Sequence, residues 1–144
     1  EFDGAIDPDT LAKMSGKMAD ALTSEGNPLY LKPEVYLTSN QRAKKAGALM
    51  KAETIKDEPN EAHEAFARVQ GLADLANDNV AFGFAHNDHV SFVEGYHEDA
   101  DGVQVETKED WKSDGATIRI YLDSVIQPVS RQGVMKQNIT TPAA

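Results

Sequence analysis

The sequence predicts an α+β fold in which helices pack on antiparallel strands, and we treat residues 1–144 as a single domain or segment. Apolar side chains recur at helical spacing over about residues 7–77, whereas over residues 80–136 they alternate or form short extended runs bounded by turns. A chain of 144 residues with 40% hydrophobic residues is also long and apolar enough to bury a core. We therefore expect a mainly helical first half and a second half of strands.

The first expected helix starts at Asp7, with Asp as the N-cap and Pro8 at the first helical position. Its apolar residues then recur to about residue 24: Leu11, Met14, Met18, Ala21 and Leu22. The turn-rich segment "SEGNP" ends this helix. A short strand, "LYLKPEVYLT", follows, in which Pro33 limits full pairing to the residues after it.

A second helix is expected after Thr38 or Ser39, with Gln41 completing a capping box on Thr38. It carries a basic cluster that is either a solvated face or an anchor for an acidic neighbour: Arg42, Lys44, Lys45 and Lys51. The polar stretch before Asn60 reads as a loop. The apolar spacing after it predicts a third helix over residues 61–77.

The period changes to that of strands after Asn79. The runs "VAFGFA" and "VSFVEGY" flank the polar turn "HNDH" and predict a hairpin. Two more strands, "VQVETKEDW" and "TIRIYLDSVI", flank "KSDG". In the last strand Ile118, Ile120 and Leu122 alternate with polar residues, so we expect this face to be half-buried.

Composition excludes several classes of function. Cysteine is absent, so neither a disulfide framework nor a thiolate metal site is expected. The longest apolar run is too short to cross a bilayer, so we expect no membrane association. The formal net charge of −10 opposes direct nucleic-acid binding, because such binding depends on Lys and Arg neutralising phosphates. The same charge leaves open an acidic DNA mimic that inhibits a DNA-handling protein.

The best metal candidates lie in two turns and comprise His86, Asp88, His89, His97, Glu98, Asp99 and Asp101. Imidazole and carboxylate ligands suit zinc or iron, yet their spacing matches no known motif. Turns also collect Asp and Asn for backbone reasons alone. The "DADG" segment resembles part of a calcium loop but lacks flanking helices. A metal-dependent enzyme at the His86–His97 turns is therefore kept only as an alternative, and no metal ligand is assigned.

No catalytic constellation is apparent. None of the serines lies in a nucleophile elbow or beside an evident base, and no glycine-rich phosphate loop occurs. Glu94 and Asp123 could form a carboxylate pair, but such residues in strands more often face solvent. Trp111 is interpreted as a core edge or an interface anchor. We expect no enzyme, no cofactor and no catalytic residue.

Taken in order, several segments resemble a known family. These are "SEGNPLYLKPEVYLTSNQRAKKAGALM", then an acidic loop with a helix, then the run from "DNVAFGFAHNDHVSFVEG" to "GATIRIYLDSVIQPVSRQGVMKQ". Over roughly residues 10–137 this order resembles the C-terminal portion of a tailed-bacteriophage major capsid protein with the Hong Kong 97-type fold. Because the chain has 144 residues and no initiating Met, the resemblance implies a portion of a larger coat protein.

The resemblance implies a structural role. The strand and helix of the first half would belong to an axial domain near the capsomer centre, and the long strands of the second half to a peripheral domain. Expected partners are copies of the chain in a large icosahedral shell, with other capsid or decoration proteins, and no sequence-specific nucleic acid. The expected location is the virion, after assembly in the host cytoplasm.

Overall fold

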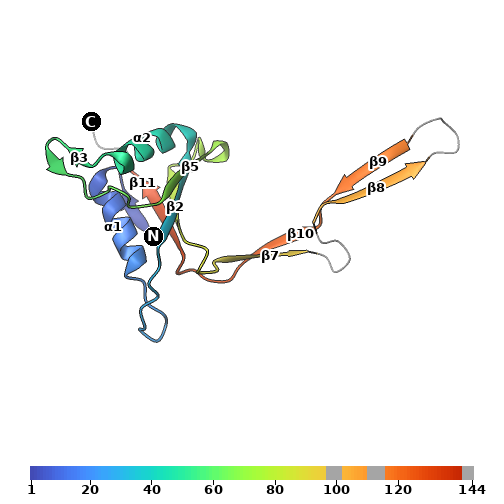
Figure 1. Ribbon diagram of the computed structural model, residues 1–144, viewed down its shortest axis with the longest axis horizontal. Coiled ribbons are helices and arrows are strands. Elements are labelled where there is room, and N and C mark those ends of the chain that lie inside the picture. Colours follow the sequence, from blue (N-terminus) through green and yellow to red (C-terminus); the bar gives the residue numbers. More distant parts are fainter. Residues whose placement is uncertain (97–101, 110–115, 141–144) are drawn as a thin grey trace. The chain divides into compact units, whose positions relative to one another are not determined.

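A computed structural model describes residues 1–96, 102–109 and 116–140 (Figure 1). By its internal contacts the chain divides into two compact units, residues 1–91 with 130–144 and residues 92–129. The fold is α+β, as the sequence predicts. The prediction of one domain over residues 1–144 stays a prediction, because a compact unit is not by itself an independently folding domain.

The first unit is built on a five-stranded sheet with the order β1-β11-β6-β2-β5. These strands span Phe2–Gly4 (β1), Val134–Ile139 (β11), Val80–Ala85 (β6), Pro33–Ser39 (β2) and Arg68–Leu72 (β5). β6 pairs antiparallel with both β11 and β2, whereas β1 lies parallel to β11 and β5 lies parallel to β2. The sheet is therefore mixed, and the parallel pairings depart from the expected antiparallel arrangement.

Two helices, α1 (Pro8–Ala19) and α2 (Asn40–Lys51), contribute side chains to one hydrophobic cluster on the same side of this sheet (Figure 1). α1 begins as predicted, since the Asp7 carboxylate accepts a 2.7 Å hydrogen bond from the Thr10 backbone N–H. It places Leu11, Met14 and Met18 in the core with no exposed surface. It ends at Ala19, earlier than expected, because the chain after Asp20 turns back toward Leu29.

A buried polar network joins the two ends of the chain to the centre of the sheet. The Tyr36 hydroxyl in β2 donates to Gln137 Oε1 in β11 at 2.7 Å. Gln137 Nε2 in turn donates to the backbone carbonyls of Gly4 at 3.1 Å and Ala5 at 3.3 Å. Both side chains have no exposed surface. Every polar atom of these two side chains is thus paired, as burial in an apolar core requires.

The third expected helix, over residues 61–77, is wrong. Residues 61–67 form turns, and the segment continues as β5 and a short 3-10 helix, Ala73–Leu75. The buried Asn60 side chain donates to the carbonyls of Leu49 and Ala52 and accepts from the Ala62 backbone N–H. These bonds hold the chain against the end of α2, and Glu64 takes a positive φ of 56°, which a helix does not allow. Ala62 and Phe66 still reach the core, which explains the misleading apolar spacing.

Two further local predictions are wrong. Residues 80–85 and 90–96 do not form a hairpin, because β6 is a central strand between β11 and β2, and residues 92–96 pair elsewhere. The intervening segment is a turn, in which the His89 N–H donates to the His86 carbonyl at 3.0 Å. The capping box on Thr38 is also absent. Ser39 is the N-cap of α2 and makes no side-chain cap bond, while Thr38 is fully buried in β2.

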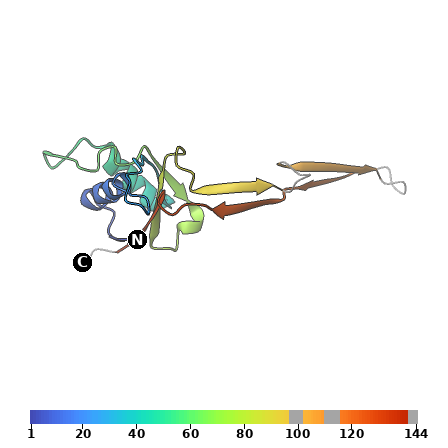
Figure 2. The same ribbon diagram turned by 90° about the horizontal axis from the view of Figure 1, so that it is seen from below.

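The second unit, residues 92–129, contains two antiparallel two-stranded ribbons, drawn as two pairs of arrows in Figure 2. β7 (Phe92–Tyr96) pairs with β10 (Ser124–Pro128), and β8 (Gln104–Glu109) pairs with β9 (Ala116–Tyr121). The second pairing is the one that the sequence predicts around "KSDG". A further small hairpin in the first unit joins β3 (Thr54–Ile55) and β4 (Glu58–Pro59). Neither helix in the described part of the chain is long and apolar enough to cross a membrane.

Tyr36→Phe should lower the free energy of unfolding by about 1–3 kcal/mol, because it leaves Gln137 Oε1 buried without its donor. Tyr30→Phe is the matched control, since Tyr30 is 80% exposed and its loss should cost less than about 0.5 kcal/mol. Urea denaturation of both variants measures the difference. Equal midpoints for the two variants would contradict the role assigned to the Tyr36 hydroxyl.

Burial raises the pKa of Tyr36 above its usual value, and the nearby Arg42 acts weakly in the opposite direction. An unfolded tyrosine ionises near pH 10, so the contribution of neutral Tyr36 is complete below about pH 10. It is lost as the pH rises from there toward the raised pKa of the folded state. We expect the unfolding free energy to fall above about pH 10, and to fall less steeply in Tyr36→Phe. Urea titrations from pH 8 to 11 test this.

Candidate functional site

The β8–β9 ribbon has one apolar face and one polar face. Residues directly opposite each other in an antiparallel pair point to the same side. Val105 lies opposite Ile120, and Thr107 lies opposite Ile118. We call these four residues the apolar ribbon face. The alternation predicted for Ile118 and Ile120 is therefore confirmed by the strand register.

The other face of the same ribbon is polar and internally paired. Tyr121 donates a 3.2 Å hydrogen bond to Glu106, and this bond raises the pKa of the Tyr121 phenol. The Arg119 guanidinium lies 3.9 Å from Glu106 and 4.9 Å from the centre of the Tyr121 ring. Gln104 and Lys108 lie on this face too, opposite Tyr121 and Thr117. The polar face is suited to solvent. The apolar ribbon face would be stabilised by contact with another surface.

The β7–β10 ribbon carries apolar residues on both faces. Opposing pairs place Ile126 on the same face as Phe92 and Tyr96, and place Val125 on the same face as Val93. All five side chains are exposed. Strands that are apolar on both sides are typical of sheets covered on both faces. This ribbon thus has the composition of a buried strand pair.

The expected half-burial of the last strand is wrong for the single chain. Ile118 is 63% exposed, Ile120 67% and Leu122 53%. Val103, Val105 and Val129 in the same unit are exposed to a similar degree. Single exposed apolar residues are ordinary, but a contiguous run of them marks a surface for another protein or a liability to aggregate. The exposed apolar side chains of this unit are of the kind that suits contact with another protein.

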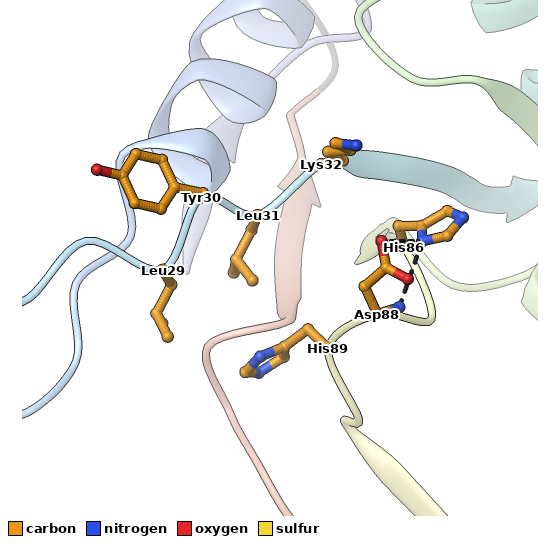
Figure 3. A pocket seen from close by; sticks show the side chains of 7 residues that line it. All are labelled: Leu29, Tyr30, Leu31, Lys32, His86, Asp88 and His89. Atoms are coloured by element: carbon orange, nitrogen blue, oxygen red, sulfur yellow. Dashed lines mark hydrogen bonds and ion pairs between the residues drawn. The ribbon is translucent and has the colours of Figure 1, made fainter.

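The structure does not bring the first three metal candidates together. His86 Nδ1 lies 3.0 Å from an Asp88 carboxylate oxygen, whereas the His89 ring points away from this pair (Figure 3). Within residues 1–96, 102–109 and 116–140 no group of three His, Asp, Glu or Cys side chains could hold a metal ion. His97, Glu98, Asp99 and Asp101 lie outside the described residues. The three described side chains line only a small pocket of about 100 Å³ with residues 29–32.

One contact that the sequence did not suggest is between His89 and Ser130, 41 positions apart. His89 Nε2 lies 2.9 Å from Ser130 Oγ, which donates its own proton to Gln132 Oε1 at 2.6 Å. With the serine proton donated to Gln132, His89 Nε2 is the donor to Ser130 Oγ, and in that arrangement the imidazole does not accept the serine proton. The Ser130 backbone N–H also donates to the Ser91 carbonyl. These bonds tie together the two segments through which the chain leaves and re-enters the first unit.

A close approach supports the same tie. Gly133 lies beside this contact, and a Cβ placed on it would collide with Ser91 Oγ. The contact between His89 and Ser130 thus has a structural role, since it holds two neighbouring segments together. Glu94 and Asp123, the other carboxylate candidates, form no hydrogen bond or ion pair with each other in the described structure. Trp111 lies outside the described residues.

Comparisons with protein families, with curated proteins and with solved structures found no match to this chain. The candidate site is accordingly defined by its own geometry. It consists of the apolar ribbon face and the two apolar faces of the β7–β10 ribbon.

Ile120→Ala should change the stability of the isolated chain by less than about 1 kcal/mol, because the side chain is mostly exposed. Leu11→Ala, in the core of the first unit, should cost about 2–5 kcal/mol. Thermal unfolding at low protein concentration, where association is minimal, measures both. A loss at Ile120 as large as that at Leu11 would mean that its apolar face is covered within one chain.

Proposed function

We propose that this chain is a structural, self-assembling protein. The observation that carries the proposal is the set of exposed Val, Ile, Phe and Tyr side chains on the two ribbons of residues 92–129. The ribbons bind their neighbours through apolar surface, while the Glu106–Arg119–Tyr121 face stays in water.

The energetics favour repeated contacts over a single one. Fully burying a Val or Ile side chain stabilises by about 1.5–3 kcal/mol. The six exposed Val and Ile side chains of the paired strands are 48–67% exposed, so covering what remains exposed contributes on the order of 5–10 kcal/mol. The free-energy cost of losing translational and rotational freedom on association is in the same range, roughly 4–15 kcal/mol. One such contact is marginal, and a closed symmetric assembly makes many of them at once.

Within this class we propose a major capsid subunit, or a segment of one, from a tailed-bacteriophage-like particle. Support comes from the resemblance of residues 10–137 to the C-terminal portion of the Hong Kong 97-type coat protein. That family has strands of a peripheral domain following an axial domain. The chain likewise combines an α+β unit with a strand-only unit, which is inserted before the last strand of the first unit. The proposed location is the virion, and the proposed partners are copies of the chain with other shell proteins.

The alternative function, an acidic DNA mimic, predicts a small species and not a large assembly. It would be a monomer or dimer that competes with DNA for a basic enzyme. Four basic residues and no acidic residue lie on α2, so the first unit carries a basic helix where a DNA mimic would need acidic side chains. Large assemblies would eliminate the mimic, and a small DNA-competing species would replace the shell proposal.

Ile118→Lys with Ile120→Lys should abolish assembly, because it places two charges on the apolar ribbon face. We expect the wild-type chain to form megadalton particles by light scattering and negative-stain imaging. The double variant should remain small, or assemble only at concentrations more than about tenfold higher.

Thr117→Lys is the matched control, because it adds a charge on the polar face of the same strand. It should leave the particles intact. Equal loss of assembly in both variants would point to a general effect of charge, and unchanged assembly in the double variant would refute the role of this face.

A further inference from the structure

A groove in the first unit, remote in sequence from the ribbons, lies between α2 and residues 63–69. Its volume is about 830 Å³. Its floor includes Met50 and Phe66, which are buried core residues, with Val69 beside them. Gly47 and Ala48 line its α2 side, and no atom lies within 4 Å of the position that a Gly47 Cβ would take. The groove is therefore open, apolar at its base and bordered by small residues.

The rim of the groove is mainly basic. Lys44 and Lys51 line it from α2 and Arg68 lines it from β5, with Glu64 the one acid among the lining residues. Across the described ranges neither lysine ammonium group has a hydrogen-bond or ion-pair partner. Arg68 has only a long contact of 3.9 Å to Glu34. α2 as a whole contains four basic residues and no acid, in a chain whose formal net charge is −10.

We propose that this groove is a socket for an acidic segment of a second copy of this chain. An apolar side chain of that segment packs on Met50 and Phe66, and its carboxylates pair with Lys44 and Lys51. The inference rests on the proposed self-assembly and adds a second, charge-driven contact to the apolar one. A second copy supplies the complement, because acids outnumber bases by 24 to 14 over the sequence. Opposite charges across a contact chiefly fix orientation and speed association.

The proposed groove contact is asymmetric. The groove and an acidic segment are different surfaces, so each copy offers both and the contact is head-to-tail. Head-to-tail contacts generate rings or extended arrays. Small anions fit the groove less well, since Lys44, Lys51 and Arg68 are all exposed and small-molecule sites enclose most of their ligand.

The test places a photo-crosslinking phenylalanine derivative at position 47 of the full chain. A Cβ at Gly47 meets open space, so a side chain can start there without collision. The matched control places the same group at Gly16 of α1, where no atom lies within 4 Å either. Irradiation at about 50 mM salt should give crosslinked dimers from position 47 and few from position 16. Mass spectrometry should map the partner peptide to a net-acidic segment. Raising the salt to about 500 mM should reduce the yield, since screening weakens contacts between exposed charges.

Charge reversal tests the rim. Lys44→Glu with Lys51→Glu should reduce the crosslink from position 47 at least about fivefold. Lys45→Glu with Lys56→Glu makes the same change in net charge outside the groove and should not. Circular dichroism confirms that each variant is folded. Equal yields from positions 47 and 16, or a partner peptide without acidic residues, would overturn the socket.

A crosslinker at Ile120 separates this inference from the proposed function. Crosslinks from 120 but not from 47 would leave self-assembly standing and remove the socket. Crosslinks from 47, in a chain whose association tolerates Ile118→Lys with Ile120→Lys, would support the socket and remove the apolar ribbon face. No crosslink from either position would overturn both.

Discussion

The first unit depends on the hydrogen bonds that converge on Gln137. One amide side chain accepts from Tyr36 in the middle of the sheet and donates to the carbonyls of Gly4 and Ala5. Gln137, which lies more than 100 positions from both other segments, thereby holds all three at one buried point. The parallel pairing of β1 with β11 places the start of the chain there, and the Asp7 cap begins α1 two residues after Ala5. The helix that fills the core is thus positioned by a polar contact inside that core.

Local signals predicted the elements whose stabilising contacts are local. The Asp7–Pro8 start of α1 and the β8–β9 hairpin follow from capping and turn chemistry over a few residues. The segment after Asn60 failed for the opposite reason. Its apolar residues reach the core at helical spacing, but Asn60 bonds to Leu49 and Ala52 hold it as turns, and Val69 pairs with Tyr36 in the sheet. The sequence of residues 61–77 alone does not predict these contacts, because the partner residues lie outside the segment.

The candidate site could be predicted in part. Alternation correctly placed Ile118 and Ile120 on one face, because strand geometry fixes which side chains share a side. Alternation could not predict whether that face is buried, because burial depends on the surface that packs against it and not on the strand's own sequence. The His89–Ser130 contact was missed because the two residues, 41 positions apart, are brought together by the pairing of β6 with β11 and of β7 with β10. The basic cluster on α2 was visible in the sequence, and one of its two interpretations was an anchor for an acidic neighbour. The groove beside it was not visible, because residues 63–69 complete it.

The place of β11 in the sheet has a consequence for synthesis on the ribosome. β11 lies between β1 and β6, yet among the described residues it is the last strand and follows the whole of residues 92–129. The apolar ribbons therefore emerge while the sheet still lacks an inner strand and Tyr36 still lacks Gln137. Chains emerge N-terminal end first, and unpaired strands exposed at that stage are prone to aggregate. The five-stranded sheet can therefore be completed only after residues 92–129 have been synthesised and β11 has inserted between β1 and β6.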